Sequence, residues 1–157
     1  MKSLLIVCSY HHHNTEKIAQ VFAKILDAQI IKPLEVNPEE LPGYDLTGFG
    51  SGIYGGKHHE YLLEFVDRLP PVTSGKAFIF STSAMTGEAK VAKDHSLLRE
   101  KLQSKGYRIV DEFSCKGFNT NSFLKYIGGM NKGRPDAEDF RHAEEFARNL
   151  KGQMHER

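Results

Sequence analysis

The amino-acid sequence predicts a three-layer α/β fold, with helices on both faces of a doubly wound, five-stranded parallel sheet. Short apolar runs alternate along the chain with longer amphipathic stretches, which is the pattern of repeated strand–helix–strand units. The first run, Leu4–Cys8, has no polar interruption, as expected for a strand covered on both faces. The 157 residues fit one domain, expected over residues 1–151 and followed by a short tail at 152–157.

The first part of the chain predicts three strands and two helices. Asn14 or Thr15 is expected to cap the first helix, because side-chain oxygens of this kind accept hydrogen bonds from first-turn N–H groups. Glycines in the third strand indicate that another group approaches its backbone closely. Pro70 and Pro71 end the second helix. In order, the elements are a strand at 4–8, a helix at 14–27, a strand at 29–34, a strand at 44–50 and a helix at 61–69.

The second part predicts two more strands and two more helices. The strand at 107–115 alternates apolar and polar residues, which favours a place at the edge of the sheet. Pro135 is expected in the first turn of the last helix. The stretch 116–134 is too long for an ordinary connection, and such loops are usually functional. The elements are a strand at 77–81, a helix around 97–106, the edge strand and a helix at 135–150.

Composition and charge exclude several classes of function. The formal net charge is +1 and the basic residues are spread along the chain, so no nucleic-acid partner is expected. The apolar runs are much shorter than the roughly 20 residues that span a bilayer, so no membrane partner is expected either. The first segment does not resemble a signal peptide, so the cytoplasm is the expected location.

Three loops are candidates for a binding site, because ligands of doubly wound sheets bind outside the carboxyl ends of the strands. The first loop leads straight into a helix, whose free backbone N–H groups and dipole favour a phosphate. It has neither the lysine of a triphosphate loop nor a dinucleotide fingerprint, so a monophosphate is the ligand it indicates. Its candidate ligand-binding residues are Ser9, His11, His13, Asn14 and Thr15.

The second and third loops suit a flat heterocycle. In the second, glycines let the backbone approach a ring on which Tyr54 stacks. In the third, small residues expose backbone donors suited to the polar edge of a heterocycle. The candidate residues are Gly52, Ile53, Tyr54, Gly55 and Gly56 in the second loop, and Ser81, Thr82, Ser83, Ala84 and Gly87 in the third.

Together these motifs resemble the flavodoxin family over nearly the whole chain. The resemblance rests on Asn14-Thr15 after the first strand, Gly52-Ile53-Tyr54 after the third and Ser81-Thr82-Ser83 after the fourth. It implies the strand order 2-1-3-4-5 and an FMN cofactor, with its phosphate in the first loop and its ring between the other two. The chain departs from the family pattern in three ways: it lacks tryptophan, it is nearly neutral where typical flavodoxins are acidic, and it has His13 where the family usually has a glycine, expected in a left-handed conformation.

Two functions compete on this scaffold. The preferred one is an electron carrier that shuttles electrons between redox partner proteins, acting as a monomer or weak homodimer. The alternative is an NAD(P)H-dependent FMN or quinone reductase, with Phe118, Phe123 and Tyr126 over the ring and Arg134 meeting an anionic substrate; Arg134 could instead form only a salt bridge near the last helix. A response-regulator receiver fits poorly, because Ser51 follows the third strand where a receiver ends it with aspartate.

Neither a metal site nor a disulfide is expected from the histidines and cysteines. A metal site is not expected at the two histidine clusters, because neither a second carboxylate nor a cysteine cluster accompanies them. His11 or His13 could instead add charge beside a phosphate. In the implied strand order Cys8 and Cys115 are about 14 Å apart, beyond the ~7 Å that a disulfide allows. Cys8 is expected to be buried, while Cys115 lies beside the site and could be exposed.

Overall fold

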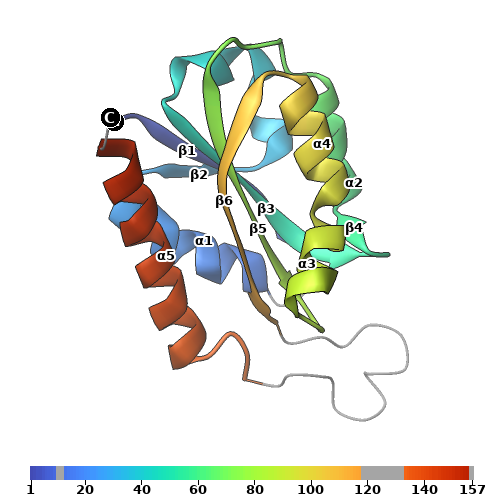
Figure 1. Ribbon diagram of the computed structural model, residues 1–157, viewed down its shortest axis with the longest axis vertical. Helices are drawn as coiled ribbons and strands as arrows, with labels where there is room; N and C mark the ends of the chain where they lie inside the picture. The colour runs from blue at the N-terminus through green and yellow to red at the C-terminus, as the bar shows by residue number, and fades with distance from the viewer. Residues whose placement is uncertain (10–12, 118–132, 156–157) are drawn as a thin grey trace.

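The computed structural model describes residues 1–9, 13–117 and 133–155, and these ranges form alternating strands and helices (Figure 1). The strands are β1 (Ser3–Cys8), β2 (Gln29–Ile31), β3 (Leu46–Tyr54), β4 (Lys57–His58), β5 (Gly75–Ser83) and β6 (Tyr107–Lys116). The α-helices are α1 (Asn14–Leu26), α2 (Glu60–Asp67), α3 (Glu88–Asp94), α4 (Ser96–Ser104) and α5 (Ala137–His155). Two 3₁₀ turns, η1 (Pro33–Glu35) and η2 (Pro38–Gly43), connect β2 to β3.

The sheet has the order β2-β1-β3-β5-β6, and every neighbouring pair in it is parallel. This confirms the predicted order of the five main strands, with β6 at the edge. The short β4 was not predicted; it pairs antiparallel with the end of β3. None of the helices in the described part of the chain is long and apolar enough to cross a membrane.

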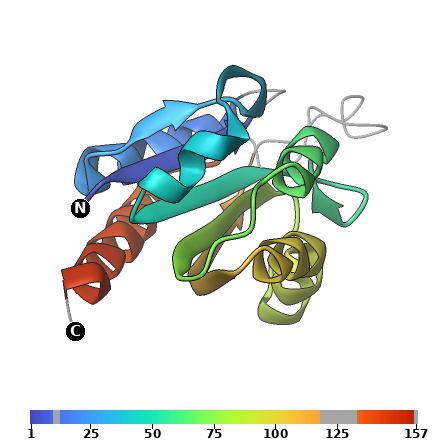
Figure 2. The same cartoon turned by 90° about the horizontal axis from the view of Figure 1, so that it is seen from above.

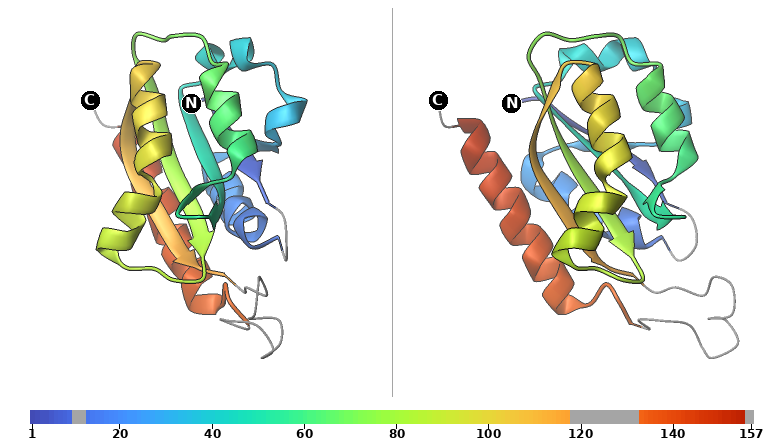
Figure 3. Two further views of the ribbon diagram at one scale, coloured as in Figure 1. Left: turned by 90° about the vertical axis from the view of Figure 1, so that its right-hand side faces the viewer. Right: turned by 45° about the vertical axis from the view of Figure 1, so that its right-hand side comes forward.

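Helices cover both faces of the sheet, which confirms the three-layer architecture. Figure 2 shows α1 and α5 on one face and α2, α3 and α4 on the other, and the two views of Figure 3 agree. The strands of the central sheet supply both faces with alternating side chains, so there are two apolar cores. Leu4, Ile6 and Ile79 belong to the core under α2 and α4, whereas Leu5 and Phe78 belong to the core under α1 and α5.

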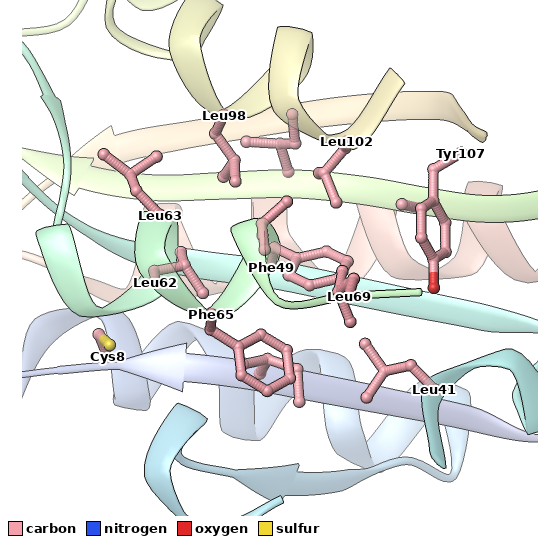
Figure 4. Close-up of a cluster of buried hydrophobic side chains, with 14 of the residues drawn as sticks. Cys8, Leu41, Phe49, Leu62, Leu63, Phe65, Leu69, Leu98, Leu102 and Tyr107 are labelled. Atoms are coloured by element: carbon pink, nitrogen blue, oxygen red, sulfur yellow. The ribbon is translucent and has the colours of Figure 1, made fainter. Parts of the chain in front are cut away.

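Each core is anchored by fully buried aromatic or branched side chains. In the core under α1, Phe22 meets Phe78 and Phe80 edge to face, with ring centroids 5.8 and 5.1 Å apart. In the other core, Phe49 of β3 and Phe65 of α2 lie among leucines of α2 and α4 (Figure 4). Burying a phenylalanine of this kind stabilises the fold by roughly 1.5–3 kcal/mol, so these residues fasten the helices to the sheet.

Glycines in β3 make room for these aromatic rings. A Cβ at Gly48 would lie 2.4 Å from the Phe78 ring, and one at Gly50 would lie 2.2 Å from the Phe80 ring. Real Cβ atoms do not approach carbon that closely, so both rings lie directly on the backbone of β3. This confirms the expectation that the glycines of the third strand mark a close approach.

Several element boundaries differ from the prediction. The strand β2 was expected to reach residue 34 but ends at Ile31, because Pro33 begins a 3₁₀ turn. α5 begins at Ala137, after a cis peptide bond between Arg134 and Pro135, so Pro135 precedes the helix. α5 also continues to His155, so residues 152–155, predicted as a tail, are helical. The helix α3 was not predicted, because its sequence contains only one large apolar residue.

The close packing at Gly50 predicts a specific loss of stability. Gly50→Ala places a methyl group against the Phe80 ring and should lower the free energy of unfolding by roughly 1–3 kcal/mol, measured by urea denaturation. Gly43→Ala is the matched control, because a Cβ there meets nothing within 4 Å, and it should stay within about 0.5 kcal/mol of wild type. Equal stability of the two variants would show that Phe80 does not lie on the strand as described.

Candidate functional site

The carboxyl ends of four parallel strands form one row across the sheet. Cys8 pairs with Ser51, Ser51 with Ser81, and Ser81 with Ser114. The three predicted loops leave the sheet at this edge, the lower one in Figure 1. Because side chains alternate along a strand, the row faces the core under α2 and α4, whereas Thr82, the next residue of β5, faces α1. The described parts of the three candidate loops therefore lie together.

The first loop turns into α1 through a left-handed residue. His13 has φ 53° and ψ 34°, which confirms the left-handed conformation expected at this position. The helix begins at Asn14, so His13 is its cap, and it forms no side-chain capping bond. The expectation that Asn14 or Thr15 caps the helix is therefore wrong: both lie within its first turn, where backbone N–H groups point out of the helix.

Ser9 and His13 contact the carboxylate-bearing turn that follows. The Ser9 hydroxyl oxygen accepts a hydrogen bond from the Glu16 N–H at 3.1 Å, so its O–H can still donate. The exposed His13 ring lies 3.1 Å from the Glu16 carboxylate. A phosphate role for His13 stays a prediction, and His11 lies outside the described residues.

Thr15 fastens the loop to the centre of the sheet. Its hydroxyl lies 2.8 Å from the hydroxyl of Thr82, and both side chains are buried. Gly117, the residue directly after β6, also packs against the first turn of α1. A Cβ at Gly117 would lie only 2.6 Å from the Asn14 side-chain nitrogen. The Gly117 N–H also donates to the Ser83 carbonyl at 3.0 Å. Gly117 was not predicted as a site residue; its signal is a glycine directly after the last strand.

The second loop is largely a β-hairpin. Gly52, Ile53 and Tyr54, predicted as loop residues, extend β3, and Tyr54 pairs with Lys57 of β4. The two residues between them, Gly55 and Gly56, have φ values of 60° and 78°. Positive φ at both central residues is the requirement of a tight type I′ hairpin, which explains the glycine pair. The prediction of a loop failed because the weak strand propensity of glycine hid the pairing.

Aromatic rings gather on this hairpin. Tyr54 meets His59 edge to face, with ring centroids 5.1 Å apart, and His59 lies 4.8 Å from the Tyr61 ring. A Cβ at Gly52 would lie 3.3 Å from the Tyr54 ring, so the ring covers the glycine backbone. Burial lowers the pKa of His59 below its usual value, which favours a neutral imidazole in this group. Stacking of Tyr54 on a ligand stays a prediction.

The third loop divides its residues between the interior and the surface. Ser81 and Thr82 belong to β5, and their hydroxyls are buried inside the protein, so only their backbone is available at the strand end. Ser83 and Ala84 are partly exposed, and Gly87 is exposed. Gly87 has φ 146°, and a Cβ there would meet nothing within 4 Å. The alternation of β5 turns the Ser81 hydroxyl inward, and a ligand contact of Ser81 through its backbone stays a prediction.

A buried polar network under this loop was missed by the sequence analysis. His95, between α3 and α4, has no exposed surface; its Nε2 lies 2.7 Å from the Ser81 hydroxyl and its Nδ1 lies 2.8 Å from Glu112. Arg99 donates to both oxygens of Glu112, each at 2.7 Å. Burial opposes ionisation of Glu112, but the bonds from His95 and Arg99 outweigh it and hold its pKa at about 2. Ser81 also donates to Ser114 at 3.1 Å.

His58, which follows the hairpin turn in β4, is also buried. Its Nε2 lies 3.0 Å from the Phe80 carbonyl and its ring lies 4.9 Å from the His95 ring. A carbonyl only accepts, so Nε2 carries the proton. Burial, together with the nearby His95, lowers the pKa of His58 to about 3, so this imidazole is neutral at ordinary pH. The two histidines join the hairpin to the segment behind the third loop.

The structure also decides two further expectations, the partner of Arg134 and the burial of Cys115. Arg134 binds the Asp139 carboxylate through two hydrogen bonds of 2.5 and 2.7 Å and lies 3.5 Å from Asp136. Of the two alternatives for this arginine, the structure thus shows the salt bridge near the last helix. Cys115 is buried, contrary to the suggestion that it is exposed, and burial raises its pKa to about 12. Phe118, Phe123 and Tyr126 lie outside the described residues.

Cys8 and Cys115 project into opposite cores, so the expectation that they do not pair holds for their positions. Burial raises the pKa of Cys8, too, to about 12. Within residues 1–9, 13–117 and 133–155, no three histidine, cysteine or acidic side chains converge on a possible metal position. The described part of the chain thus supplies hydroxyls, backbone N–H groups and aromatic rings at this edge.

The comparisons with known proteins agree with this arrangement. The model of the flavodoxin domain matches residues 5–119, which is most of the chain. The chain belongs to the flavodoxin family. The uncharacterized protein MJ0298 of Methanocaldococcus jannaschii is 45% identical to it over 150 residues, covering 96% of this chain and 98% of that protein.

Solved structures of flavodoxins share the fold. A flavodoxin from the domain Archaea superposes with a TM-score of 0.75 at 16% identity, covering 99% of this chain and 100% of the other. The apo form of the NADH:FMN oxidoreductase EmoB superposes with a TM-score of 0.60 at 20% identity, covering 96% of this chain and 90% of the other. At such identities, the likeness shows the fold alone.

The residues present fit the flavin that the family implies. The helix dipole of α1 favours an anion at its first turn, and Ser9, which accepts from the Glu16 N–H of this turn, keeps a proton to donate, which suits a phosphate dianion. At Gly55 and Gly87 an added Cβ would meet nothing within 4 Å, so the backbone there is open to a flat ligand. The flavodoxin family's phosphate loop and its two ring loops thus have counterparts in this chain.

Two hollows lie away from this edge. One, of about 950 Å³, is at the opposite end of the sheet, between Leu41–Asp45, Pro71–Lys76 and the end of α5. The other, of about 850 Å³, lies between α1 and α5 and is lined by lysines and partly buried apolar residues. Neither adjoins a carboxyl strand end, where this fold places its ligand, so the loop edge is the candidate site.

The neutral burial of His58 predicts a pH-dependent stability. The unfolded chain binds a proton at this imidazole below about pH 6.5, whereas the folded chain does so only near pH 3. The unfolded state therefore binds more protons in this window, and His58 contributes stability that is present above pH 6.5 and lost as the pH falls toward 3, by up to ~1.4 kcal/mol per pH unit.

His58→Gln keeps a side-chain N–H for Phe80 but removes the titration, so urea unfolding at several pH values should show a shallower loss of stability than in wild type. His142→Gln, at an exposed position of α5, is the control and should retain the wild-type slope. Superimposable slopes for wild type and His58→Gln would contradict the buried neutral histidine.

Proposed function

We propose that this flavodoxin-family chain binds FMN at the carboxyl ends of β1, β3 and β5 and carries electrons between redox partner proteins. The observation that carries the proposal is the left-handed turn at His13, after which the Glu16 N–H in the first turn of α1 donates to the Ser9 hydroxyl directly after β1. The dipole and backbone N–H groups at a helix amino terminus favour binding of a phosphate dianion.

The protein's own residues would bind and orient the cofactor. Ser9 and the first turn of α1 would hold the phosphate. Tyr54, at the end of β3, would cover one face of the ring, and backbone at Ser83–Gly87 would meet its polar edge. Gly55 and Gly56 allow the hairpin peptide to approach the ring, because positive φ costs glycine little. Bound FMN supplies the electron-accepting and electron-donating chemistry.

The carrier function is favoured over a reductase by the state of Arg134. This arginine was the candidate for binding an anionic substrate, but its guanidinium is paired with Asp139 and Asp136. The nearly neutral charge of the chain, +1, also distinguishes it from acidic flavodoxins that dock on basic partners. We therefore expect its redox partners to present a surface without strong charge.

The phosphate loop predicts a large difference between FMN and riboflavin. Charge-assisted hydrogen bonds to the phosphate contribute about 1.5–3 kcal/mol, so FMN should bind roughly 10- to 100-fold more tightly than riboflavin in fluorescence titrations. Ser9→Ala should weaken FMN binding severalfold and leave riboflavin binding unchanged. Ser74→Ala, at the opposite end of the sheet, is the control. Equal affinities for the two flavins would contradict the phosphate site.

The spectrum of the freshly purified protein separates the two functions. We expect flavin absorption bands, stepwise reduction by an anaerobic reductant, and no bleaching on addition of NADH or NADPH. Rapid bleaching by a nicotinamide nucleotide would replace the carrier with an NAD(P)H-dependent FMN or quinone reductase, as in the NADH:FMN oxidoreductase of the same fold. A colourless protein that does not bind added FMN would exclude both functions.

A further inference from the structure

A chain of five polar side chains runs from the surface of α4 to the ends of two strands. Arg99 binds Glu112, Glu112 binds His95 Nδ1, His95 Nε2 meets Ser81, and Ser81 meets Ser114. His95 is completely buried and Ser81 is 1% exposed, whereas Arg99 and Glu112 remain about one quarter exposed. This hydrogen-bond network thus connects solvent beside α4 with the serine hydroxyls at the carboxyl ends of β5 and β6.

The hydrogen atoms of this chain allow only two arrangements. Glu112 is ionised and can only accept, so His95 Nδ1 must donate to it. If His95 is neutral, its Nε2 accepts the Ser81 proton, so Ser81 cannot donate to Ser114 as well. If His95 is cationic, its Nε2 donates to Ser81, and Ser81 donates to Ser114. The protonation of His95 Nε2 therefore decides whether the Ser81 hydroxyl donates to the imidazole or to Ser114.

We propose that His95 is a positioning residue of the flavin site, and that gain or loss of a proton at its Nε2 makes or breaks the hydrogen bond that Ser81 donates to Ser114. The proposal rests on the proposed function for its effect on FMN. Ser81 leads directly to the backbone of the third loop, and His95 fastens the α3–α4 junction beneath that loop. Protonation of His95 would also add a positive charge behind the site, which favours an anionic ligand.

The groups that face His95 come from every element packed against it. Glu112 of β6 stabilises the cation directly, and Arg99 of α4, bound to the same carboxylate, opposes it. His58 of β4 lies 4.9 Å away, ring to ring, and is held neutral by burial. Asp94, the residue before His95, is paired with Lys90 of α3. Of the two histidines, His95 is the one that is hydrogen-bonded to a carboxylate.

The same residue types form the relay of serine hydrolases, but the burial of Ser81 excludes that role here. A nucleophilic serine must reach its substrate, whereas the Ser81 hydroxyl faces the interior and is already bonded to Ser114. The network instead couples the protonation state of His95 to the hydrogen bonds of Ser81 in β5 and Ser114 in β6.

Nuclear magnetic resonance of the FMN-free protein tests the relay without the cofactor. Long-range ¹H–¹⁵N spectra from pH 5 to pH 9 should show that His95 keeps its Nδ1 proton throughout and gains one at Nε2 as the pH falls. The backbone amides of Ser81 and Ser114 should shift with the same midpoint. A His95 ring whose protonation state does not change over this range would overturn the proposal.

Variants then separate the relay from a merely structural role. In His95→Gln the Ser114 amide should stop titrating, and the exposed control His142→Gln should leave it titrating. If His95→Gln does not fold, Ser81→Ala provides the second test, because His95 should still titrate while Ser114 no longer follows. A Ser114 amide that titrates as in wild type in a folded His95→Gln or Ser81→Ala protein would overturn the proposal.

The effect on the site is measured by FMN affinity at pH 5.5 and pH 8. The ratio of wild-type to His95→Gln affinity should rise about threefold at the lower pH, as expected for one added charge partly screened by solvent. Titration of the FMN phosphate itself is common to both proteins and cancels in this ratio. An unchanged ratio overturns the positioning role. A protein that shows the relay by magnetic resonance but binds no FMN contradicts the proposed function and supports the relay.

Discussion

The alternation of side chains at the end of β5 is the constraint on which the rest of the site depends. Thr82 points to one face and reaches Thr15 in the first turn of α1, whereas Ser81 points to the other and reaches His95 at the α3–α4 junction. Neighbouring residues of one central strand therefore hold both the first turn of α1 and the α3–α4 junction. Parallel pairing with β3 places the hairpin beside them. The three loops are positioned by a rigid sheet rather than by one another.

The buried polar groups around this edge have a clear energetic logic. A buried charge or hydrogen-bonding group destabilises the fold unless it is paired. Glu112 satisfies this rule through Arg99 and His95, and His58 satisfies it by staying neutral and donating to a carbonyl. Breaking one partner of such a network leaves the other unpaired, so its members act as a unit. This network makes the loop edge a preorganised surface.

Much of the fold was predictable from the sequence, because it depends on local patterns. Uninterrupted apolar runs identified the central strands, and the alternating pattern at 107–115 identified the edge strand β6. The hairpin at Tyr54–Lys57 was not predicted, because its pairing depends on the positive φ values of two glycines rather than on β propensity. The helix α3 has too few apolar residues to show a periodic pattern.

The site was predictable only in part, for the same reason. The glycines and hydroxyls at the strand ends mark the loops, and the left-handed conformation of His13 follows from the family pattern. The inward direction of Ser81 and the partnership of His95 with Glu112 join residues distant in sequence, so they appear only when the sheet register is known. A lone histidine between two helices carries no such signal.

The most direct test of the account is to map FMN binding on the ¹⁵N-labelled protein by magnetic resonance. If FMN binds at the carboxyl ends of the strands, stoichiometric FMN should leave the amides of Thr73–Lys76 at the opposite hollow unchanged. It should shift the amides of Ser9, Asn14, Thr15, Tyr54–Gly56 and Ser83–Gly87. Shifts confined to that hollow, or to the groove between α1 and α5, would contradict the placement of the flavin at the carboxyl edge.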